Sequence, residues 1–397
     1  MATVACPYCY HMIDQARLAF QCRGRGVPGG AQRCVRARDE VREQLTGVGE
    51  PMLPVFTVDL RLPGIGREAR CPRCKGPTSV RACPTCHTPL SATFGESNSP
   101  LIGLVGGKGA GKTVYTAVLH HELRNSVRRR FAADIRLVGG QQGGFGSARQ
   151  WLETNEEQLY GDGKLFAATA AARDGIRAPV VIEWRQPRRR LGRETFETTV
   201  LSFYDAAGED LRSVESVRDQ AYLEVCKGLV LLLDPWQLPG VAARIDVPRW
   251  APGSSVPPLE ILGAITDLLR MTHRVSASKK VPVPLAVVFA KIDALYPVLG
   301  PDHPLMRPTR TTGGYDDAAG QSTHEHVRAM LHDYGADDID ALLEHNYANF
   351  RSFAVSALGA PPDYDRDVID GNGVRPFRVE EPLLWLLTRF GVLGGRW

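Results

Sequence analysis

The sequence predicts an α/β fold with a mostly parallel sheet flanked by helices, preceded by a small cysteine-rich module. Three observations support this prediction. Apolar, β-prone runs alternate with longer helical patterns from residue 101 onward, which is typical of a parallel sheet covered on both faces. Eight of the nine cysteines precede residue 90. A glycine-rich turn joins the first apolar run to the first long helical pattern.

The chain is long enough for two or three compact units, since it has 397 residues, of which 43% are hydrophobic and 23% charged. The segment 91–100 is rich in small and turn-forming residues and is expected to be a linker. We therefore predict a cysteine-rich module over residues 1–95 and an α/β domain over residues 96–397.

Six runs in the second domain are predicted strands: Leu101–Val105, Val180–Trp184, Thr199–Tyr204, Leu229–Leu233, Leu285–Ala290 and Phe353–Val355. Seven segments have helical patterns: 112–128, 148–160, 211–224, 259–272, 324–332, 339–345 and 381–390. Two segments, 238–258 and 296–322, are expected to be peripheral loops.

Several classes of protein are excluded or not favoured. No run reaches the ~18 consecutive apolar residues that a membrane span requires. The first residues lack the apolar core of a secretory signal, so a cytoplasmic, reducing compartment is expected, in which the cysteines would not form disulfides. A net charge of +4, from 48 basic and 44 acidic residues, does not by itself indicate a nucleic-acid partner.

Paired cysteines in the first module indicate zinc. Cys71 and Cys74, and Cys83 and Cys86, form two C-x2-C motifs eight residues apart, so that two thiolate pairs on tight turns can meet around one tetrahedral ion. A proline inside each motif fixes the turn and leaves backbone N–H groups to point at sulfur. The arrangement resembles a zinc ribbon. A closed site of four thiolates has no open position, so its zinc is expected to be structural.

The remaining four cysteines of the module predict a second zinc site: Cys6, Cys9, Cys22 and Cys34. The spacing equally allows Cys6 and Cys9 to pair with a later C-x2-C motif, and His11 or His87 could replace a thiol. A redox dithiol is the other interpretation of C-x2-C, but a surrounding βαβ pattern is missing from this part of the sequence. We expect one or two structural Zn²⁺ ions.

The glycine-rich turn has the pattern G-x4-G-K-[ST] between a strand and a helix, which is typical of a phosphate-binding loop. Its residues are Gly106, Gly107, Lys108, Gly109, Ala110, Gly111, Lys112 and Thr113. The glycines let successive backbone N–H groups surround the β-phosphate. Lys112 is expected to reach the β- and γ-phosphates, and the Thr113 hydroxyl to ligate Mg²⁺.

With this loop, the chain resembles the P-loop GTPases of the translation-factor and small-GTPase class. Leu201–Gly208 resembles their D-x-x-G element. The resemblance implies that Asp205 holds the magnesium shell and that the Gly208 N–H senses the γ-phosphate. An ordinary turn after a strand is the alternative.

Two further segments resemble the base-reading elements of that class. Val287–Asp293 looks like N-K-x-D, which implies that Asp293 binds guanine N1 and N2 and that the Lys291 stem packs on the base. The sequence departs from the pattern at Ala290, where Asn is usual, and this removes one polar tie. Val355–Leu358 resembles the S-A-K element, whose backbone N–H meets guanine O6, and its candidate residues are Ser356 and Ala357.

A switch threonine that closes over Mg²⁺ should lie between Thr113 and Asp205. Thr169 is the candidate because it precedes the strand that leads towards Asp205. A plain loop residue is the alternative.

The combined pattern resembles the double-GTPase-type proteins of bacterial multi-gene conflict or regulatory operons. This resemblance implies a GTP-dependent switch or assembly component with Mg²⁺ and GTP or GDP as ligands, which acts with protein partners encoded nearby.

Two rivals remain. An ATPase shares the phosphate loop, and Ala290 leaves guanine selection mainly to Asp293. The other rival is a zinc-ribbon interaction or nucleic-acid module whose nucleotide domain does not hydrolyse, with Arg128–Arg130 and Arg188–Arg190 as candidate phosphate-binding surfaces. Nucleic acid is the less favoured partner, because such triplets are usually solvated.

The residue after Gly208 predicts slow hydrolysis. Glu209 stands where small GTPases commonly carry a water-orienting Gln, and its carboxylate would repel the γ-phosphate. A single-turnover assay without partners should show slow turnover, and rapid hydrolysis would contradict the prediction. Lys108→Gly, assayed with and without a partner, tests whether the Lys108 ammonium excludes an external arginine finger or acts in its place. A lysine that is merely solvated would leave both the basal and the partner-stimulated rates unchanged.

Overall fold

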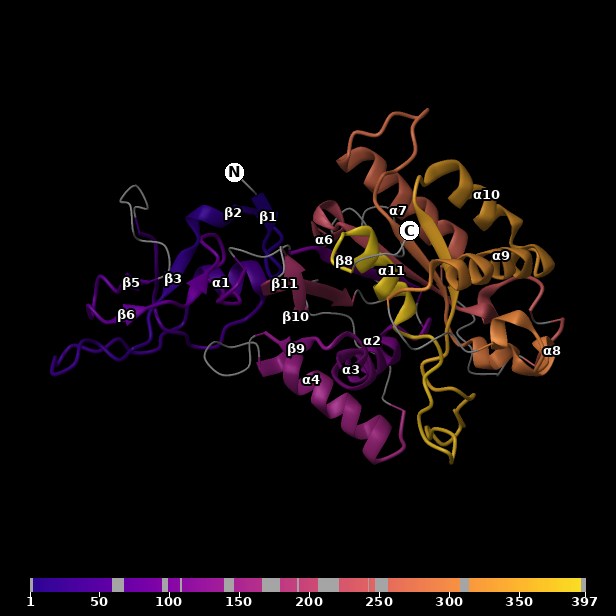
Figure 1. Cartoon of the computed structure of the whole chain (residues 1–397), viewed down its shortest axis with the longest axis horizontal. Coiled ribbons are helices and arrows are strands. Elements are labelled where there is room, and N and C mark those ends of the chain that lie inside the picture. The colour runs from indigo at the N-terminus through magenta and orange to yellow at the C-terminus, as the bar shows by residue number, and fades with distance from the viewer. Residues whose placement is uncertain are drawn as a thin grey trace. The chain divides into compact units, whose positions relative to one another are not determined.

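The computed structural model (Figure 1) describes residues 3–58, 68–94, 99–107, 109–138, 146–165, 179–190, 193–205, 221–241, 243–246, 256–307 and 314–393. The chain folds into two compact units that do not follow chain order. Unit 1 comprises residues 1–101, 133–151 and 176–204, and unit 2 comprises residues 102–132, 152–175 and 205–397. The division at 95/96 stays a sequence-based prediction.

Four parallel strands form the centre of unit 2, in the order β14-β13-β12-β8. They are β8 (Leu101–Gly106), β12 (Gly228–Leu233), β13 (Leu285–Phe289) and β14 (Phe350–Ala354). Every residue of β8, β12 and β13 is buried. Because successive side chains point to opposite faces, these strands are covered on both faces, as predicted for apolar runs without alternation.

Helices of several lengths surround these strands. They are α2 (Lys112–Glu122), α3 (Arg128–Phe131), α6 (Ala221–Val225), α7 (Pro258–Thr272), α8 (Tyr296–Leu299), α9 (Asp317–Asp333), α10 (Asp337–Asn346) and α11 (Glu381–Arg389). The segment α4 (Gly146–Glu156) continues as a π-helical turn over Glu157–Gly161. Within the described ranges, no helix is long and apolar enough to cross a bilayer.

The prediction of a loop over 296–322 is wrong over its last six residues, 317–322. Helix α9 begins at Asp317, seven residues before the predicted start, because Asp316 caps it and accepts a hydrogen bond from Ala319 N at 3.1 Å. Short helical turns occupy 296–299 and 304–306 as well. Of the predicted helix 211–224, only residues from 221 onward belong to the described part of the chain.

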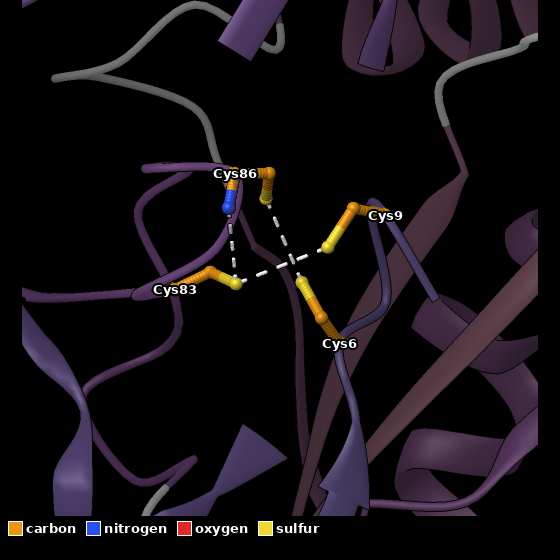
Figure 2. A group of neighbouring side chains, drawn as sticks. All are labelled: Cys6, Cys9, Cys83 and Cys86. Atoms are coloured by element: carbon orange, nitrogen blue, oxygen red, sulfur yellow. Dashed lines mark hydrogen bonds between the residues drawn. The ribbon is translucent and has the colours of Figure 1, made fainter. Parts of the chain in front are cut away.

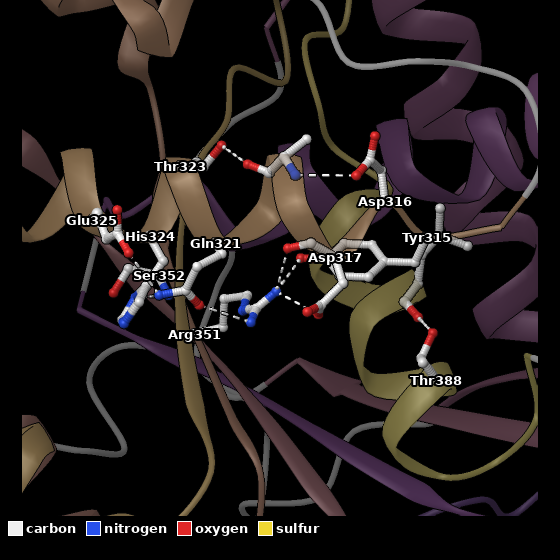
Figure 3. A network of polar contacts seen from close by, with 12 residues as sticks. Tyr315, Asp316, Asp317, Gln321, Thr323, His324, Glu325, Arg351, Ser352 and Thr388 are labelled. Atoms are coloured by element: carbon white, nitrogen blue, oxygen red, sulfur yellow. Dashed lines mark hydrogen bonds and ion pairs between the residues drawn. The ribbon is translucent and has the colours of Figure 1, made fainter. Parts of the chain in front are cut away.

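A buried arginine attaches α9 to β14 (Figure 3). Arg351 of β14 donates to Asp317 Oδ1 at 2.7 Å and to Gln321 Oε1 at 3.0 Å. One residue later, Ser352 N donates to His324 Nδ1 at 3.1 Å. Buried polar groups are stable only when hydrogen-bonded, so these contacts fix the position of the helix along the strand.

Unit 1 contains an antiparallel hairpin of β10 (Val180–Arg190) and β11 (Arg193–Asp205), and β9 (Asp134–Leu137) pairs with β10. The hairpin strands contain both predicted runs and extend beyond them, whereas β9 was not predicted. Within unit 1 the strand order is β11-β10-β9. The predicted α/β class is confirmed.

The cysteine-rich part of unit 1 consists of short strands and one helix: β1 (Thr3–Ala5), β2 (Met12–Asp14), β3 (Ala19–Gln21), α1 (Glu40–Thr46), β4 (Val55–Phe56), β5 (Ala69–Arg70), β6 (Pro77–Thr78) and β7 (Arg81–Ala82). Its buried core includes four cysteines, Phe94, and Val181 and Val200 of the hairpin. The hairpin and the cysteine-rich part therefore share one hydrophobic core.

Candidate zinc clusters and nucleotide site

Two groups of four cysteines converge in unit 1, each with all sulfur atoms within 4.8 Å of one another. The first cluster is Cys6, Cys9, Cys83 and Cys86, and the second cluster is Cys22, Cys34, Cys71 and Cys74. In the first, whose sulfur atoms face one another in Figure 2, Cys6 and Cys86 are 3.8 Å apart and Cys9 and Cys83 are 3.9 Å apart. In the second, the Cys22–Cys74 and Cys34–Cys71 separations are 3.5 Å and 3.8 Å.

This partition corrects the first predicted arrangement, in which Cys71, Cys74, Cys83 and Cys86 shared one ion. The interleaved pairing, which the spacing left open, is the one that the structure shows.

The ladder between β3 and β7 explains the partition. Ala19 pairs with Ala82 in antiparallel register, which places Cys83 beyond one end of the ladder and Cys22 beyond the other. At about 3.3 Å per residue, the two cysteines are about 13 Å apart along the ladder. They therefore cannot ligate the same ion. Cys83 instead shares a cluster with the C-x2-C motif of Cys6 and Cys9, and Cys22 shares one with that of Cys71 and Cys74.

The three C-x2-C motifs have the same backbone turn. In each, the residue after the second cysteine has a positive φ, at Tyr10 (63°), Lys75 (60°) and His87 (60°), and its N–H donates to the carbonyl of the first cysteine. Backbone N–H groups also point at sulfur, as from Gly24 to Cys22 at 3.2 Å. These N–H groups are the partners that stabilise thiolate ligands.

The geometry and chemistry of both clusters fit Zn²⁺. A tetrahedral ion with Zn–S bonds of ~2.3 Å requires sulfur atoms about 3.8 Å apart, whereas a disulfide would require ~2.05 Å. Burial raises the pKa of Cys6 well above its usual value, so thiolates here need a neighbouring cation. Each cluster already has four sulfur atoms, and neither His11 nor His87 belongs to one. Their Nδ1 atoms contact Cys9 O and Asp39.

The candidate nucleotide site lies at the carboxyl ends of the parallel strands of unit 2. The glycine-rich loop follows β8, Asp234 follows β12, Lys291 follows β13 and Ser356 follows β14. Backbone hydrogen bonds join the last two loops, from Ile292 N to Val355 O at 3.0 Å. In open α/β sheets, ligands bind at this edge.

The described residues of the glycine-rich loop include two glycines with left-handed backbone conformation and the buried Lys112. Gly109 (φ 76°) and Gly111 (φ 87°) occupy the left-handed region, which side chains other than glycine rarely adopt. Lys112 begins α2, is buried, and donates through Nζ to the carbonyls of Gly106 and Gly107 at 2.9 Å and 3.1 Å. No side chain caps the amino end of α2, and an uncapped helix amino terminus attracts anions.

Asp234 is a residue of the site that the sequence reasoning missed. Its carboxylate is fully buried and accepts a 2.7 Å ion pair from Lys291 Nζ, which also donates to Gly109 O at 2.6 Å. The Lys291 ammonium lies 4.4 Å from the ring centroid of Trp236, which contacts Tyr364 edge-on. The sequence signal that could have identified Asp234 is a carboxylate directly after the apolar run Leu229–Leu233.

Asp293 and Ser356, both named as candidate base-reading residues, contact each other. Asp293 is 5% exposed, and burial raises the pKa of its carboxyl. A hydrogen bond from the Ser356 side chain and the charge of Lys291 oppose that shift. Ser356 Oγ also accepts from Gly359 N at 2.7 Å. A ligand that donates two N–H groups would compensate this poorly solvated carboxylate.

Several predicted residues lie outside the described residues: Lys108, Thr169, Gly208 and Glu209. Asp205 ends β11, but its side chain belongs to the part that is not described. The described residues of the loop and the base-reading segments are brought together at one sheet edge, and their roles remain predictions.

Comparison with known proteins found one full-length relative. No family profile matches the chain. A protein of Mycolicibacterium smegmatis, SaeC, named for a proposed role in ESX-1 scaffolding and assembly, is 26% identical over 415 residues, which span 98% of this chain and 99% of that protein.

Among solved structures, the GTP-bound GTPase-like domain of S. cerevisiae Ski7 aligns with 76% of this chain at 12% identity and a TM-score of 0.29. The chain spans about half of that structure, at 52%. A likeness at this score carries no functional argument.

The interleaved cysteine pairing makes a prediction about zinc content. Cys71→Ser with Cys83→Ser damages both clusters and should remove both ions, whereas Cys34→Ser with Cys71→Ser damages one and should remove one. The first predicted arrangement implies the opposite result. Elemental analysis of the purified full chain measures the zinc content, with Cys226→Ser as the control that should retain two ions.

Proposed function

We propose that the chain is a GTP-binding protein that hydrolyses GTP slowly and acts as a nucleotide-dependent switch in the assembly of a multi-protein system. The observation that carries the proposal is the contact of Lys291 with both Gly109 O and Asp234. The Lys291 ammonium thereby links the candidate phosphate loop to the candidate base-reading loop. Because these two loops would bind opposite ends of a nucleotide, the link supports one site formed by both.

The chemistry proposed for this site is phosphoryl transfer to water. The loop N–H groups and Lys112 would bind the phosphates, and Asp293 with Ser356 would orient guanine. Thr113 and Asp205 would hold Mg²⁺, which supplies charge neutralisation when it is bound. Hydroxyl and carboxylate oxygens are ligands that Mg²⁺ prefers.

The role in assembly comes from the relative. The alignment spans nearly the whole of both chains, so it includes the parts of this chain that hold the cysteine clusters and the candidate nucleotide site. We extend the scaffolding and assembly role in the relative's name to this chain, with proteins as partners and with nucleotide state as the control of their binding.

The proposal predicts a preference for guanine nucleotides. Calorimetry on zinc-replete protein with Mg²⁺ should show tighter binding of GTP and GDP than of ATP. Asp293→Asn should weaken guanine binding at least about tenfold, since it replaces a charged acceptor of two hydrogen bonds worth ~1.5–3 kcal/mol.

Asp333→Asn is the matched control, because Asp333 is exposed on α9 and should not affect nucleotide binding. Equal or tighter ATP binding that does not depend on Asp293 would support the ATPase alternative, which the alanine at position 290 keeps open.

The buried ion pair makes a separate prediction. Asp234→Asn keeps the shape and the acceptor for Trp236 N but removes the charge that holds Lys291. Lys291 then loses its fixed position beside Gly109, and affinity for nucleotide should fall about tenfold, which corresponds to ~1.4 kcal/mol.

Asp340→Asn is the control for that variant, because Asp340 is also buried and pairs with Arg328 at 2.6 Å, between α9 and α10. Both variants should lower the urea midpoint, but only Asp234→Asn should weaken nucleotide binding. Similar nucleotide affinities for Asp234→Asn and Asp340→Asn would contradict the proposal that Asp234 positions Lys291 for nucleotide binding.

A further inference from the structure

Basic residues are distributed unequally between the two cysteine clusters. Seven cations lie within three residues of a ligand of the second cluster: Arg23, Arg25, Arg33, Arg36, Arg70, Arg73 and Lys75. By the same criterion, the first cluster has only Arg81. By the same criterion one acidic residue, the exposed Glu68, lies near the second cluster, whereas segments 15–38 and 69–95, which contain the seven cations, hold no aspartate or glutamate. We call the seven residues the basic patch.

The patch is one surface, although its residues come from two segments. The ligands Cys22, Cys34, Cys71 and Cys74 bring both segments around one point. The backbones also touch, since a Cβ added to Gly76 would lie 2.7 Å from Gly26 O.

All seven side chains are exposed, and within the described residues none of them pairs with a carboxylate. Their contacts are with neutral groups, such as Arg23 with Ser79 Oγ at 3.2 Å and Lys75 with Pro72 O at 2.8 Å. Arginines elsewhere in the module do have acidic partners, as Arg17 has Asp14 and Arg38 has Glu43.

Compensation of the cluster's own charge does not explain the patch. Zinc with four thiolates carries two negative charges at either cluster. The first cluster is more deeply buried and needs compensation more, yet it has one buried neighbour, Arg42, and the half-buried Arg81. Exposed cations stabilise a nearby negative charge only weakly in water. Seven exposed cations are therefore more than the charge of the second cluster requires.

We propose that the basic patch binds the phosphate backbone of double-stranded nucleic acid without sequence preference. Six of the seven cations are arginines, whose planar guanidinium matches phosphate oxygens in pairs. A surface on which seven cations outnumber the one nearby carboxylate, Glu68, fits a partner of uniformly negative charge, as a phosphodiester backbone is, better than a protein surface of mixed sign. This binding goes beyond the proposed nucleotide switch and does not depend on it.

The aromatic residues near the patch favour a duplex over a single strand. Phe20 is buried, and Phe56 is half-buried and stacks on it with ring centroids 6.2 Å apart. Phe20 has no exposed face, and Phe56 uses one of its faces to stack on Phe20, whereas proteins that bind single strands stack bases on exposed aromatic rings.

The test measures fluorescence anisotropy of a labelled duplex DNA of about 20 base pairs with the zinc-replete full chain, between about 50 and 200 mM salt. The patch variant carries Arg23→Gln, Arg33→Gln, Arg70→Gln and Arg73→Gln. The control carries Lys227→Gln, Arg274→Gln, Lys279→Gln and Lys280→Gln, four exposed cations of unit 2, so both variants lose the same charge.

Wild type and control should bind the duplex, and affinity should fall steeply as salt rises. The patch variant should bind at least about tenfold more weakly, and its slope of log affinity against log salt should fall by about 3 to 4, at ~0.9 per lost phosphate contact. Zinc content should stay at two ions in every variant, which shows that the module remains folded.

Three results would overturn the inference. The first is no duplex binding by wild type at the lowest salt. The second is equal weakening in the control, which would make the effect one of net charge rather than of the basic patch. The third is binding of poly-L-glutamate at the patch without binding of the duplex, which would indicate an acidic protein partner.

Discussion

The parallel ladder of β8, β12, β13 and β14 is the constraint on which the candidate nucleotide site depends. Parallel strands all end at the same edge of a sheet, so each strand delivers its following loop to one place. The glycine-rich loop, Asp234, Lys291 and Ser356 are far apart in the sequence but follow successive strands of this ladder. Because β8, β12 and β13 are buried along their whole length, the edge is held rigidly.

Charge at that edge is balanced by one ion pair. A carboxylate as deeply buried as that of Asp234 is stable only beside a cation, and Lys291 is that cation. The same ammonium contacts Gly109 O, so stability of the fold and conformation of the phosphate loop depend on the same contact. Changes at the base-reading loop are therefore expected to reach the phosphate loop.

In unit 1 the cysteine clusters are expected to supply stability that apolar packing supplies in unit 2. Strands of two or three residues bury little apolar surface, and metal binding supplies the missing stability in such modules. The first cluster lies inside the core that includes Val181 and Val200, whereas the second has the half-buried Cys34 and a border of exposed cations. One cluster thus supports the hydrophobic core, and the other holds a charged surface in place.

The sequence by itself determined the elements whose signals are local. Apolar runs predicted the strands of unit 2, and each C-x2-C motif predicted a metal-binding turn, because strand burial and turn geometry depend on neighbouring residues. The start of α9 was missed although its signal, the capping Asp316, is local. The short strand β9 was missed because it depends on pairing with β10. Only the tertiary structure decided which cysteines share an ion and that Asp234 meets Lys291. Both depend on strand register between distant segments, and no local spacing encodes that register.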